Sequence, residues 1–419
     1  MNSPPSSTNV VPSIQDGTGD DEVARAFLVR LGQLLHAHGA PAMRLEEALT
    51  SCSLQLGIVG QFLSTPTSLL YGFGEGAAQR MHLTRVEPGD VDLGKLSDLD
   101  AVIEGILLGR LEAADGLARV EELEAAPRRY ARWTLVPGFA LAAGTAACFF
   151  GGSTVDAVLG TFCGLLIGTL ALIVGNRQRA VLVFETLASV IAAALGVVAA
   201  SQVPEASSRI ITLSGLIVLV PGLTLTVAMN ELASRHLVAG TARLAWAAMI
   251  FLSIGLGVGG GHALQRLLPA AERVADAPPL PEWAFLLAFL LAPLAFAVLF
   301  KARKRDLPWV LLAGWLGFAG ARFGASFLGP NLGVSIGALL VGLASNAYAR
   351  RFNRPASVMQ VPGIMLLVPG SFGFKSVSSF LERDVLSGVE SAFDMAQIAG
   401  ALVGGLLFAN ALLRPRRSL

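Results

Sequence analysis

Long apolar blocks dominate the chain from Trp133 onward and constrain its fold more than any other feature. Each block has about 20 residues, which is the length that a helix needs to cross ~30 Å of hydrocarbon. Backbone groups find no water in lipid, so such segments must be helical. The whole chain is 53% hydrophobic and only 15% charged, whereas soluble domains carry about 25% charged residues. The sequence therefore predicts a polytopic α-helical membrane protein.

About ten transmembrane helices are expected from the spacing of these blocks. Lysine and arginine concentrate in alternate flanks of the blocks, and short cytoplasmic loops carry such an excess. This pattern predicts an even number of spans in the cytoplasmic membrane, with both termini in the cytoplasm. The expected spans are roughly 133–151, 154–175, 180–200, 209–229, 241–263, 282–300, 307–327, 330–349, 361–379 and 393–413.

The region before the first span is expected to be soluble. Residues 1–20 have a composition typical of a disordered tail. Residues 21–130 contain two amphipathic helical patterns, three short extended segments and two more helical patterns. We expect a small cytoplasmic domain of the α/β or α+β class over 21–130, followed by a first transmembrane half over 131–270 and a second over 280–419.

A repeated segment indicates that the membrane part consists of two related units. "SGLIVLVPG" (Ser214–Gly222) is similar to "PGIMLLVPG" (Pro362–Gly370), which begins 148 residues later. In the expected order these segments belong to the fourth and ninth spans, so each is the fourth helix of a five-helix unit. An odd number of helices gives the two units opposite orientations. Two inverted five-helix repeats are typical of secondary transporters.

Proline and glycine interrupt both copies of the repeated segment, at Pro221–Gly222 and Pro369–Gly370. Proline removes a backbone donor and costs about 3 kcal/mol inside a helix. In many transporters, interrupted helices meet near the middle of the membrane, where half-helix ends and freed carbonyls bind ions and substrate. A proline kink that packing simply tolerates is the alternative interpretation.

Longer stretches around these breaks form a recognisable pattern. The soluble part contains "LLHAHGAPAMRLEEALTSCSLQLG" and "FLSTPTSLLYGFG", and the membrane halves contain "LVPGLTLTVAMNELASRHLVAGTARL" and "RRFNRPASVMQVPGIMLLVPGSFGFKSV". With these stretches the chain resembles the threonine/serine exporter family over nearly its whole length, in a form that fuses two halves. In the first membrane half, Pro221, Gly222, Glu231, Gly240 and Arg243 fill the family pattern, with Glu231 where that pattern has aspartate. The resemblance implies proton-coupled export of threonine or serine.

Charged residues within the spans are candidates for transport because ionisable groups are costly in lipid. Glu231 and the neighbouring Asn230 end the fourth span and are expected to bind a substrate ammonium, or in the case of Glu231 the coupling proton. Glu185, in the third span, is a second candidate for proton coupling, and Lys375 is expected to pair with a substrate carboxylate. Interfacial or snorkelling positions remain open for these charges. The other candidate substrate-binding residues lie at or just after the breaks: Pro221, Gly222, Thr224, Pro369, Gly370 and Ser371.

Four pairs of glycines have GxxxG spacing, which lets helices pack closely in membranes. The sequence therefore predicts close helix contacts at each pair. The pairs are Gly164/Gly168, Gly320/Gly324, Gly333/Gly337 and Gly400/Gly404.

Other functions remain open at this point. An exporter of a dicarboxylate such as succinate would also suit Lys375, and a passive channel would also use broken helices. A membrane-embedded hydrolase is weakly supported, because the soluble part groups few nucleophiles with bases, and we expect no enzyme activity. A GxxxxGK[ST] loop is absent, which argues against ATP-driven pumping. We expect no cofactor, no metal and no nucleic-acid partner. The expected partners are a small-molecule substrate, protons and membrane lipid, with homo-oligomer formation left open.

Overall fold

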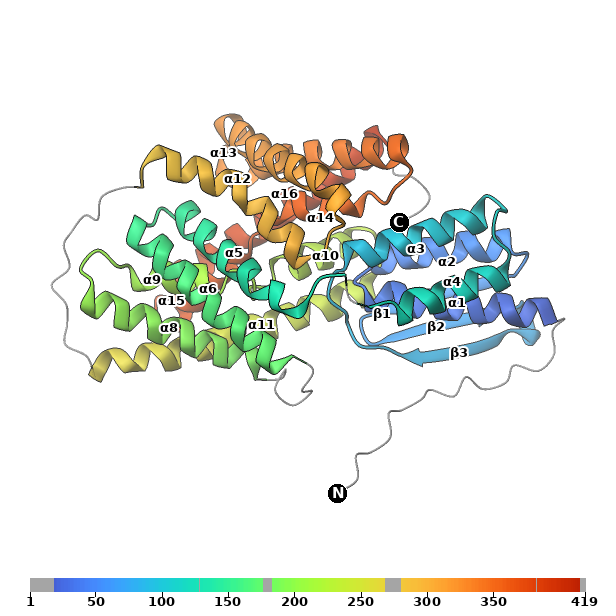
Figure 1. The fold of residues 1–419 in the computed structure, drawn as a ribbon, viewed down its shortest axis with the longest axis horizontal. Coiled ribbons are helices and arrows are strands. Elements are labelled where there is room, and N and C mark those ends of the chain that lie inside the picture. Colours follow the sequence, from blue (N-terminus) through green and yellow to red (C-terminus); the bar gives the residue numbers. More distant parts are fainter. Residues whose placement is uncertain (1–18, 128, 176–182, 268–279, 382, 415–419) are drawn as a thin grey trace, which may run out of the picture.

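A computed structural model describes residues 19–127, 129–175, 183–267, 280–381 and 383–414. An N-terminal unit of helices and strands lies beside a larger bundle of helices (Figure 1). Nearly all of the expected tail lies outside the described residues, and its last two residues already belong to the first helix.

The N-terminal unit pairs four helices with a three-stranded antiparallel sheet in the order β1-β2-β3. The strands are consecutive in the chain, so the arrangement is α+β, which is one of the two alternatives expected from the sequence. Every helix and strand of the unit lies where the sequence pattern predicts it. The elements are α1 (Gly19–Ala37), α2 (Ala42–Gln55), β1 (Gly60–Thr65), β2 (Ser68–Phe73), β3 (Arg80–Arg85), α3 (Leu93–Leu107) and α4 (Ala113–Ala125).

One hydrophobic core holds the N-terminal unit together. It joins the apolar faces of α1, α2 and α3 to one face of the sheet, and its largest fully buried side chain is Tyr71. The Tyr71 hydroxyl donates a hydrogen bond to the Val29 carbonyl at 3.1 Å, which satisfies a polar group inside this core. The unit therefore has its own core, and Val91 connects that core to a small buried cluster in which Leu93 contacts the bundle.

The lowered pKa values of two histidines predict how the stability of this unit depends on pH. Burial lowers the pKa of His36 below its usual 6.5, although its ring nitrogen Nε2 donates to the Thr65 carbonyl. Burial also lowers the pKa of His38. The unfolded chain therefore binds more protons than the folded unit below about pH 6.5, at a cost of up to about 1.4 kcal/mol per pH unit for each histidine.

The N-terminal unit should thus keep its full stability above pH 6.5 and lose stability as the pH falls. Hydrogen exchange of α1 amides at pH 7.5 and pH 5.5, corrected for intrinsic rates, measures this loss. A variant with His36→Gln and His38→Gln should show a shallower slope. Burial raises the pKa of Glu46, which acts in the opposite direction, but Glu46 is present in both proteins. An equal slope in both would contradict the prediction.

The bundle contains eleven labelled helices of the described chain. Its first half comprises α5 (Leu135–Phe149), α6 (Thr154–Val174), α8 (Phe184–Gln202), α9 (Ser208–Gly215), α10 (Gly222–Ala233) and α11 (Leu237–His262). Its second half comprises α12 (Glu282–Leu299), α13 (Leu307–Phe352), α14 (Ser357–Met365), α15 (Gly370–Leu381) and α16 (Val385–Leu412).

Seven helical segments of the described chain are long and apolar enough to cross a membrane. This confirms a polytopic helical membrane protein, while the count of ten stays a prediction. The difference has local causes. Helix α5 has only 15 residues, and α9 and α10 are separate short pieces. Helix α13 joins two expected spans across Gly329, whose backbone is not helical (φ 79°, ψ 168°).

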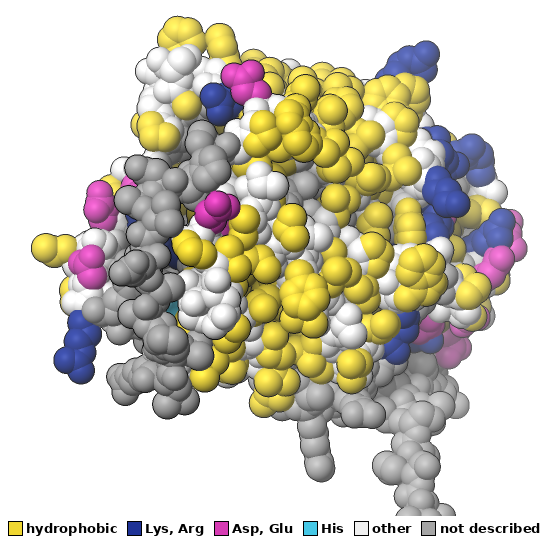
Figure 2. Space-filling view, turned by 60° about the vertical axis from the view of Figure 1, so that its left-hand side comes forward, with side chains coloured by type: hydrophobic (Ala, Val, Ile, Leu, Met, Phe, Trp, Pro, Cys, Tyr) yellow, Lys and Arg dark blue, Asp and Glu magenta, His cyan; other side chains and the backbone are white. Residues whose placement is uncertain are grey.

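The surface of the bundle is apolar, as a lipid-facing surface must be. Figure 2 shows hydrophobic side chains covering the middle of one face, with charged side chains toward its edges. Several large side chains on the membrane helices are strongly exposed, including Phe162, Leu256, Trp283, Phe323 and Phe408. In water such a surface would be an aggregation site, whereas in a bilayer it contacts hydrocarbon.

Three of the four GxxxG pairs lie at close helix contacts. A Cβ on Gly164 would lie 2.6 Å from the Phe139 carbonyl oxygen of α5, and one on Gly320 would lie 2.9 Å from the Cα of Gly337. For the pair Gly400/Gly404 the prediction is wrong within this chain, because a Cβ at either position meets nothing within 4 Å. Spacing alone does not say which face of a helix finds a neighbour.

Candidate functional site

Both helices that carry the Pro-Gly repeat are broken in the structure. Helix α9 ends at Gly215 and α10 begins at Gly222, while α14 ends at Met365 and α15 begins at Gly370. Helices α10 and α15 both have 12 residues and start 148 positions apart. Helices α11 and α16 also start 148 positions apart. The correspondence seen in nine residues of sequence thus extends over two whole helices.

The two breaks lie against each other, and we call this contact the crossing. A Cβ on Gly222 would lie 2.7 Å from a methyl group of Val368 and 3.3 Å from the backbone nitrogen of Gly370. Reciprocally, a Cβ on Gly370 would lie 2.6 Å from a methyl group of Val220 and 3.4 Å from the Cα of Gly222. The two backbones therefore pack closely at the crossing, and a methyl group on either glycine would have to displace the valine side chain that faces it.

Each broken helix reaches from its own half into the other. Helix α15 lies among the helices of the first half (Figure 1) and packs on α11. Helix α10 packs on α16 of the second half. Accordingly, Phe374 of α15 belongs to the hydrophobic core of the first half, and Leu223 of α10 packs on that of the second. The exchange of broken helices between the two halves is therefore reciprocal.

The predicted binding residues divide into two groups. Pro221, Gly222, Pro369 and Gly370 form the crossing, and both Thr224 and Ser371 lie within two residues of it along the chain. Lys375 follows on α15 with an exposed side chain.

Asn230 and Glu231 lie at the other end of α10. Glu231 is nine residues beyond Gly222, or about 13 Å along the helix axis. The structure therefore does not bring these two residues to the crossing.

Glu231 lies at the junction between the membrane bundle and the N-terminal unit. Its side chain is fully buried, and Arg243 Nε donates to both carboxylate oxygens at 3.1 and 3.0 Å. The backbone nitrogen of Ala42, the first residue of α2, donates to Oε1 at 3.0 Å. An anion at a helix N-terminus also interacts favourably with the helix dipole. The contacts of Glu231 thus fasten α2 to the end of α10.

A second polar contact accompanies this one. His236, which follows α10, lies with its Nε2 3.2 Å from Oε2 of Glu46 on α2. The other oxygen of Glu46 accepts a hydrogen bond from the backbone nitrogen of Ser64 at 2.7 Å. The N-terminal unit is therefore fastened through α2 to the segment between α10 and α11, and Glu46 also joins α2 to β1.

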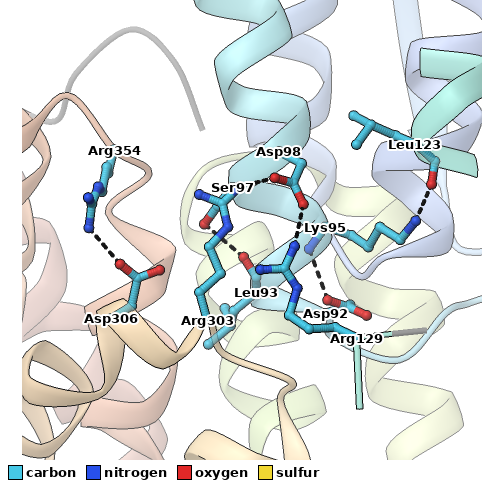
Figure 3. Close-up of polar contacts among 10 residues, drawn as sticks. All are labelled: Asp92, Leu93, Lys95, Ser97, Asp98, Leu123, Arg129, Arg303, Asp306 and Arg354. Atoms are coloured by element: carbon cyan, nitrogen blue, oxygen red, sulfur yellow. Dashed lines mark hydrogen bonds and ion pairs between the residues drawn. The ribbon is translucent and has the colours of Figure 1, made fainter. Parts of the chain in front are cut away.

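The N-terminal unit also contacts the second half, at the loop between α12 and α13. Figure 3 shows Arg129 and Arg303 converging on the carboxylate of Asp98 in α3. The backbone nitrogen of Leu93 donates to the Phe300 carbonyl at 2.9 Å, and the Tyr130 hydroxyl donates to the Ala302 carbonyl at 2.7 Å. The N-terminal unit therefore contacts both halves of the bundle.

Glu185, the other predicted proton-coupling residue, lies in the first turn of α8 with a partly buried side chain. Its carboxylate has no hydrogen bond or ion pair with the described residues. Helix α8 packs on α9 and α11, and not on α10 or α15 in any extensive way. The structure thus keeps Glu185 apart from the crossing. Proton coupling by Glu185 stays a prediction.

The sequence did not single out one polar cluster of the bundle, which is partly buried between α13 and α16. The side-chain nitrogen of Asn331 donates to Asp394 at 2.6 Å and to Gln397 at 3.1 Å, which joins α13 to α16. Asp394 lies ten residues into a helix that the apolar pattern assigned to the membrane. The signal for it was present, because an ionisable residue in such a segment is a functional candidate.

Comparison with known families agrees with this architecture. The profile of the family described as "Putative threonine/serine exporter" matches residues 26–265. The profile described as "Threonine/Serine exporter, ThrE" matches residues 284–412. The two matches follow the division into two membrane halves, the first of them with the N-terminal unit. No solved structure gave a significant match to the chain.

Curated relatives include fungal proteins called "Pheromone-regulated membrane protein 10". The chain is 27% identical over 378 residues to that of Pichia sorbitophila, covering 87% of this chain and 37% of the relative. It is 29% identical over 387 residues to that of Eremothecium gossypii, covering 88% and 50%. The chain thus spans a third to a half of the length of these relatives. With both family profiles matched in sequence along one polypeptide, the chain belongs to the threonine/serine exporter family, in a form that fuses its two parts.

Proposed function

We propose that this protein is a secondary transporter that exports a small hydrophilic metabolite, with threonine and serine as the first candidates and the proton gradient as the driving force. The observation that carries the proposal is the crossing, where two broken helices from corresponding positions of two units meet. Transporters with repeated units bind substrate between such helices. The family membership supports export as the direction of transport.

The two units are inverted repeats in this proposal. The first comprises α5, α6, α8, the broken pair α9–α10, and α11. The second comprises α12, the two parts of α13 on either side of Gly329, the broken pair α14–α15, and α16. Five segments in each unit give opposite orientations in the membrane. The reciprocal packing of α10 on α16 and of α15 on α11 supports a two-fold relation between the units.

The N-terminal unit lies in the cytoplasm in this proposal, and transport requires the crossing to open. The unit contacts the bundle beside Arg243 and at Arg303, which belong to the arginine-rich flanks typical of the cytoplasmic side. Opening the crossing would expose the segments 216–221 and 366–369, whose backbone groups are outside regular helices. Thr224 and Ser371 would then offer hydroxyl groups to a hydroxy amino acid, and Lys375 a cation to its carboxylate.

Transport by the full chain in proteoliposomes tests the proposal. Labelled threonine, serine and succinate are offered separately, with and without an imposed pH gradient. We expect gradient-dependent flux of threonine or serine that an uncoupler abolishes. Flux of succinate alone would show that the substrate is a dicarboxylate, and the proposed mechanism would stand. Gradient-independent flux would indicate a channel, and absence of flux of all three solutes would contradict the proposal.

The hydroxyl groups next to the crossing should contribute to substrate binding. Removing both hydroxyls with Thr224→Ala and Ser371→Ala should lower flux about ten-fold or more, since one hydrogen bond to a charged group contributes about 1.5–3 kcal/mol. Thr241→Ala is the matched control, because the Thr241 hydroxyl is exposed and donates only to the Leu237 and Val238 carbonyls of its own helix. Equal flux in the double variant and in the Thr241→Ala control would show that the two hydroxyls do not bind the substrate.

A further inference from the structure

A basic pocket lies between the N-terminal unit and the second membrane half. It has a volume of about 440 Å³ and is open to solvent. Asp98 of α3 and Arg129 contribute from the N-terminal unit, and the loop between α12 and α13 contributes the rest. The lining residues are Asp98, Arg129, Arg303, Lys304 and Arg305.

Positive charge in this pocket exceeds negative charge by three. Among the described residues, four cations line it, and Asp98 is the one carboxylate in the lining. Asp98 is shared by Arg129, at 2.8 Å, and Arg303 (Figure 3). The nearby carboxylate of Asp306 already binds Arg354 at 2.7 Å. Each guanidinium has five N–H donors, so most donors of Arg129 and Arg303 remain for another acceptor.

Arg303 lies in an unfavourable position for a lone cation. Its side chain is buried, and burial lowers its pKa, with Asp98 acting against this and Arg305 and Arg129 adding to it. A cation that is desolvated next to other cations needs a further anion. Guanidinium groups match the geometry of phosphate oxygens, which they bind through paired hydrogen bonds.

The pocket lies where phosphate groups are abundant. Its loop follows α12, an apolar helix that ends at Leu299, and precedes α13. The end of a membrane helix lies at the level of the lipid headgroups. Basic pockets at the cytoplasmic ends of membrane helices can bind phosphorylated headgroups.

We propose that this pocket binds a phosphate-bearing anion, either the headgroup of an anionic lipid or a free phosphate, and that the anion fastens the N-terminal unit to the second membrane half. The bound phosphate would accept from Arg129 and Arg303 and would face Lys304 and Arg305. This site is distinct from the crossing and does not depend on which metabolite is transported.

Thermal unfolding of the full chain in lipid nanodiscs tests the proposal. The probes are inorganic phosphate in phosphatidylcholine discs, with chloride at equal ionic strength as reference, and discs that also contain phosphatidylglycerol. The variant Lys304→Gln with Arg305→Gln removes two exposed cations and should fold normally. The control, Arg350→Gln with Arg351→Gln, removes two exposed arginines at the end of α13.

We expect at least one probe to raise the unfolding midpoint by a few degrees in the unchanged protein and in the control, since a ligand stabilises the state that binds it. The shift should be lost in the Lys304/Arg305 variant. Stabilisation by inorganic phosphate identifies a free phosphate as the ligand, and stabilisation by phosphatidylglycerol discs alone identifies the lipid. Equal shifts in all three proteins, or none in any, would overturn the proposal.

Discussion

Gly222→Val should abolish transport while leaving the protein inserted in the membrane. The Cβ of any larger residue would lie 2.7 Å from Val368 and 3.3 Å from the backbone of Gly370. Overpacking a closed contact costs about 1–3 kcal/mol, and valine adds two methyl groups at a helix start that must approach another backbone. We expect the two broken helices to separate, and substrate flux to fall at least ten-fold.

Flux measured in proteoliposomes, at equal amounts of inserted protein, checks this expectation. Gly400→Val is a matched control, because a Cβ at Gly400 meets nothing within 4 Å. Gly370→Val should act as Gly222→Val does, since the two glycines contact each other reciprocally. Unchanged flux in either crossing variant would show that this contact does not limit transport.

Arg243→Ala should release the N-terminal unit from the end of α10. Without Arg243, the carboxylate of the fully buried Glu231 keeps, among the described residues, only the Ala42 backbone nitrogen as a partner. Removing one member of a buried ion pair costs about 3–5 kcal/mol, because it leaves an uncompensated charge. This is a large share of the roughly 5–15 kcal/mol that stabilises a typical domain.

Hydrogen exchange of α2 and limited proteolysis of the full chain measure the release. Arg44→Ala is the control, because Arg44 pairs with the exposed Glu47 three residues along the same helix, and such pairs contribute at most about 1 kcal/mol. Arg243→Ala with Glu231→Gln should recover part of the loss, since it removes the charge that Arg243 compensates. Equal protection of α2 in the Arg243→Ala protein and the unchanged protein would show that the pair does not hold the unit.

Local patterns were sufficient to predict the elements of the N-terminal unit. Its helices and strands follow from amphipathic periodicity and short β-branched or aromatic runs, which depend on residues close in sequence. The start of α6 in the membrane bundle is equally local, because Ser153 and Asp156, three residues apart, form a reciprocal cap there. The sheet order was not predictable in this manner, because pairing joins residues that the local pattern treats separately.

The role of Glu231 shows what a pattern cannot supply. Its position at the end of an apolar segment suggested a binding group for substrate or proton. The partners that the structure gives it are Arg243, 12 residues later, and Ala42, 189 residues earlier. The second of these contacts depends on how the N-terminal unit docks, and nothing in the sequence near Glu231 encodes that arrangement.

By itself, the sequence determined the membrane fold, the two breaks and their repeat, because hydrophobic length and proline act locally on the backbone. Only the tertiary structure decided that the breaks touch, that each broken helix packs on the opposite half, and that the N-terminal unit contacts both halves. Those features depend on side-chain packing and ion pairs between segments far apart in the chain, such as Gly222 with Gly370 and Asp98 with Arg303. Close packing has no local sequence signature, as the unoccupied face at Gly400 also shows.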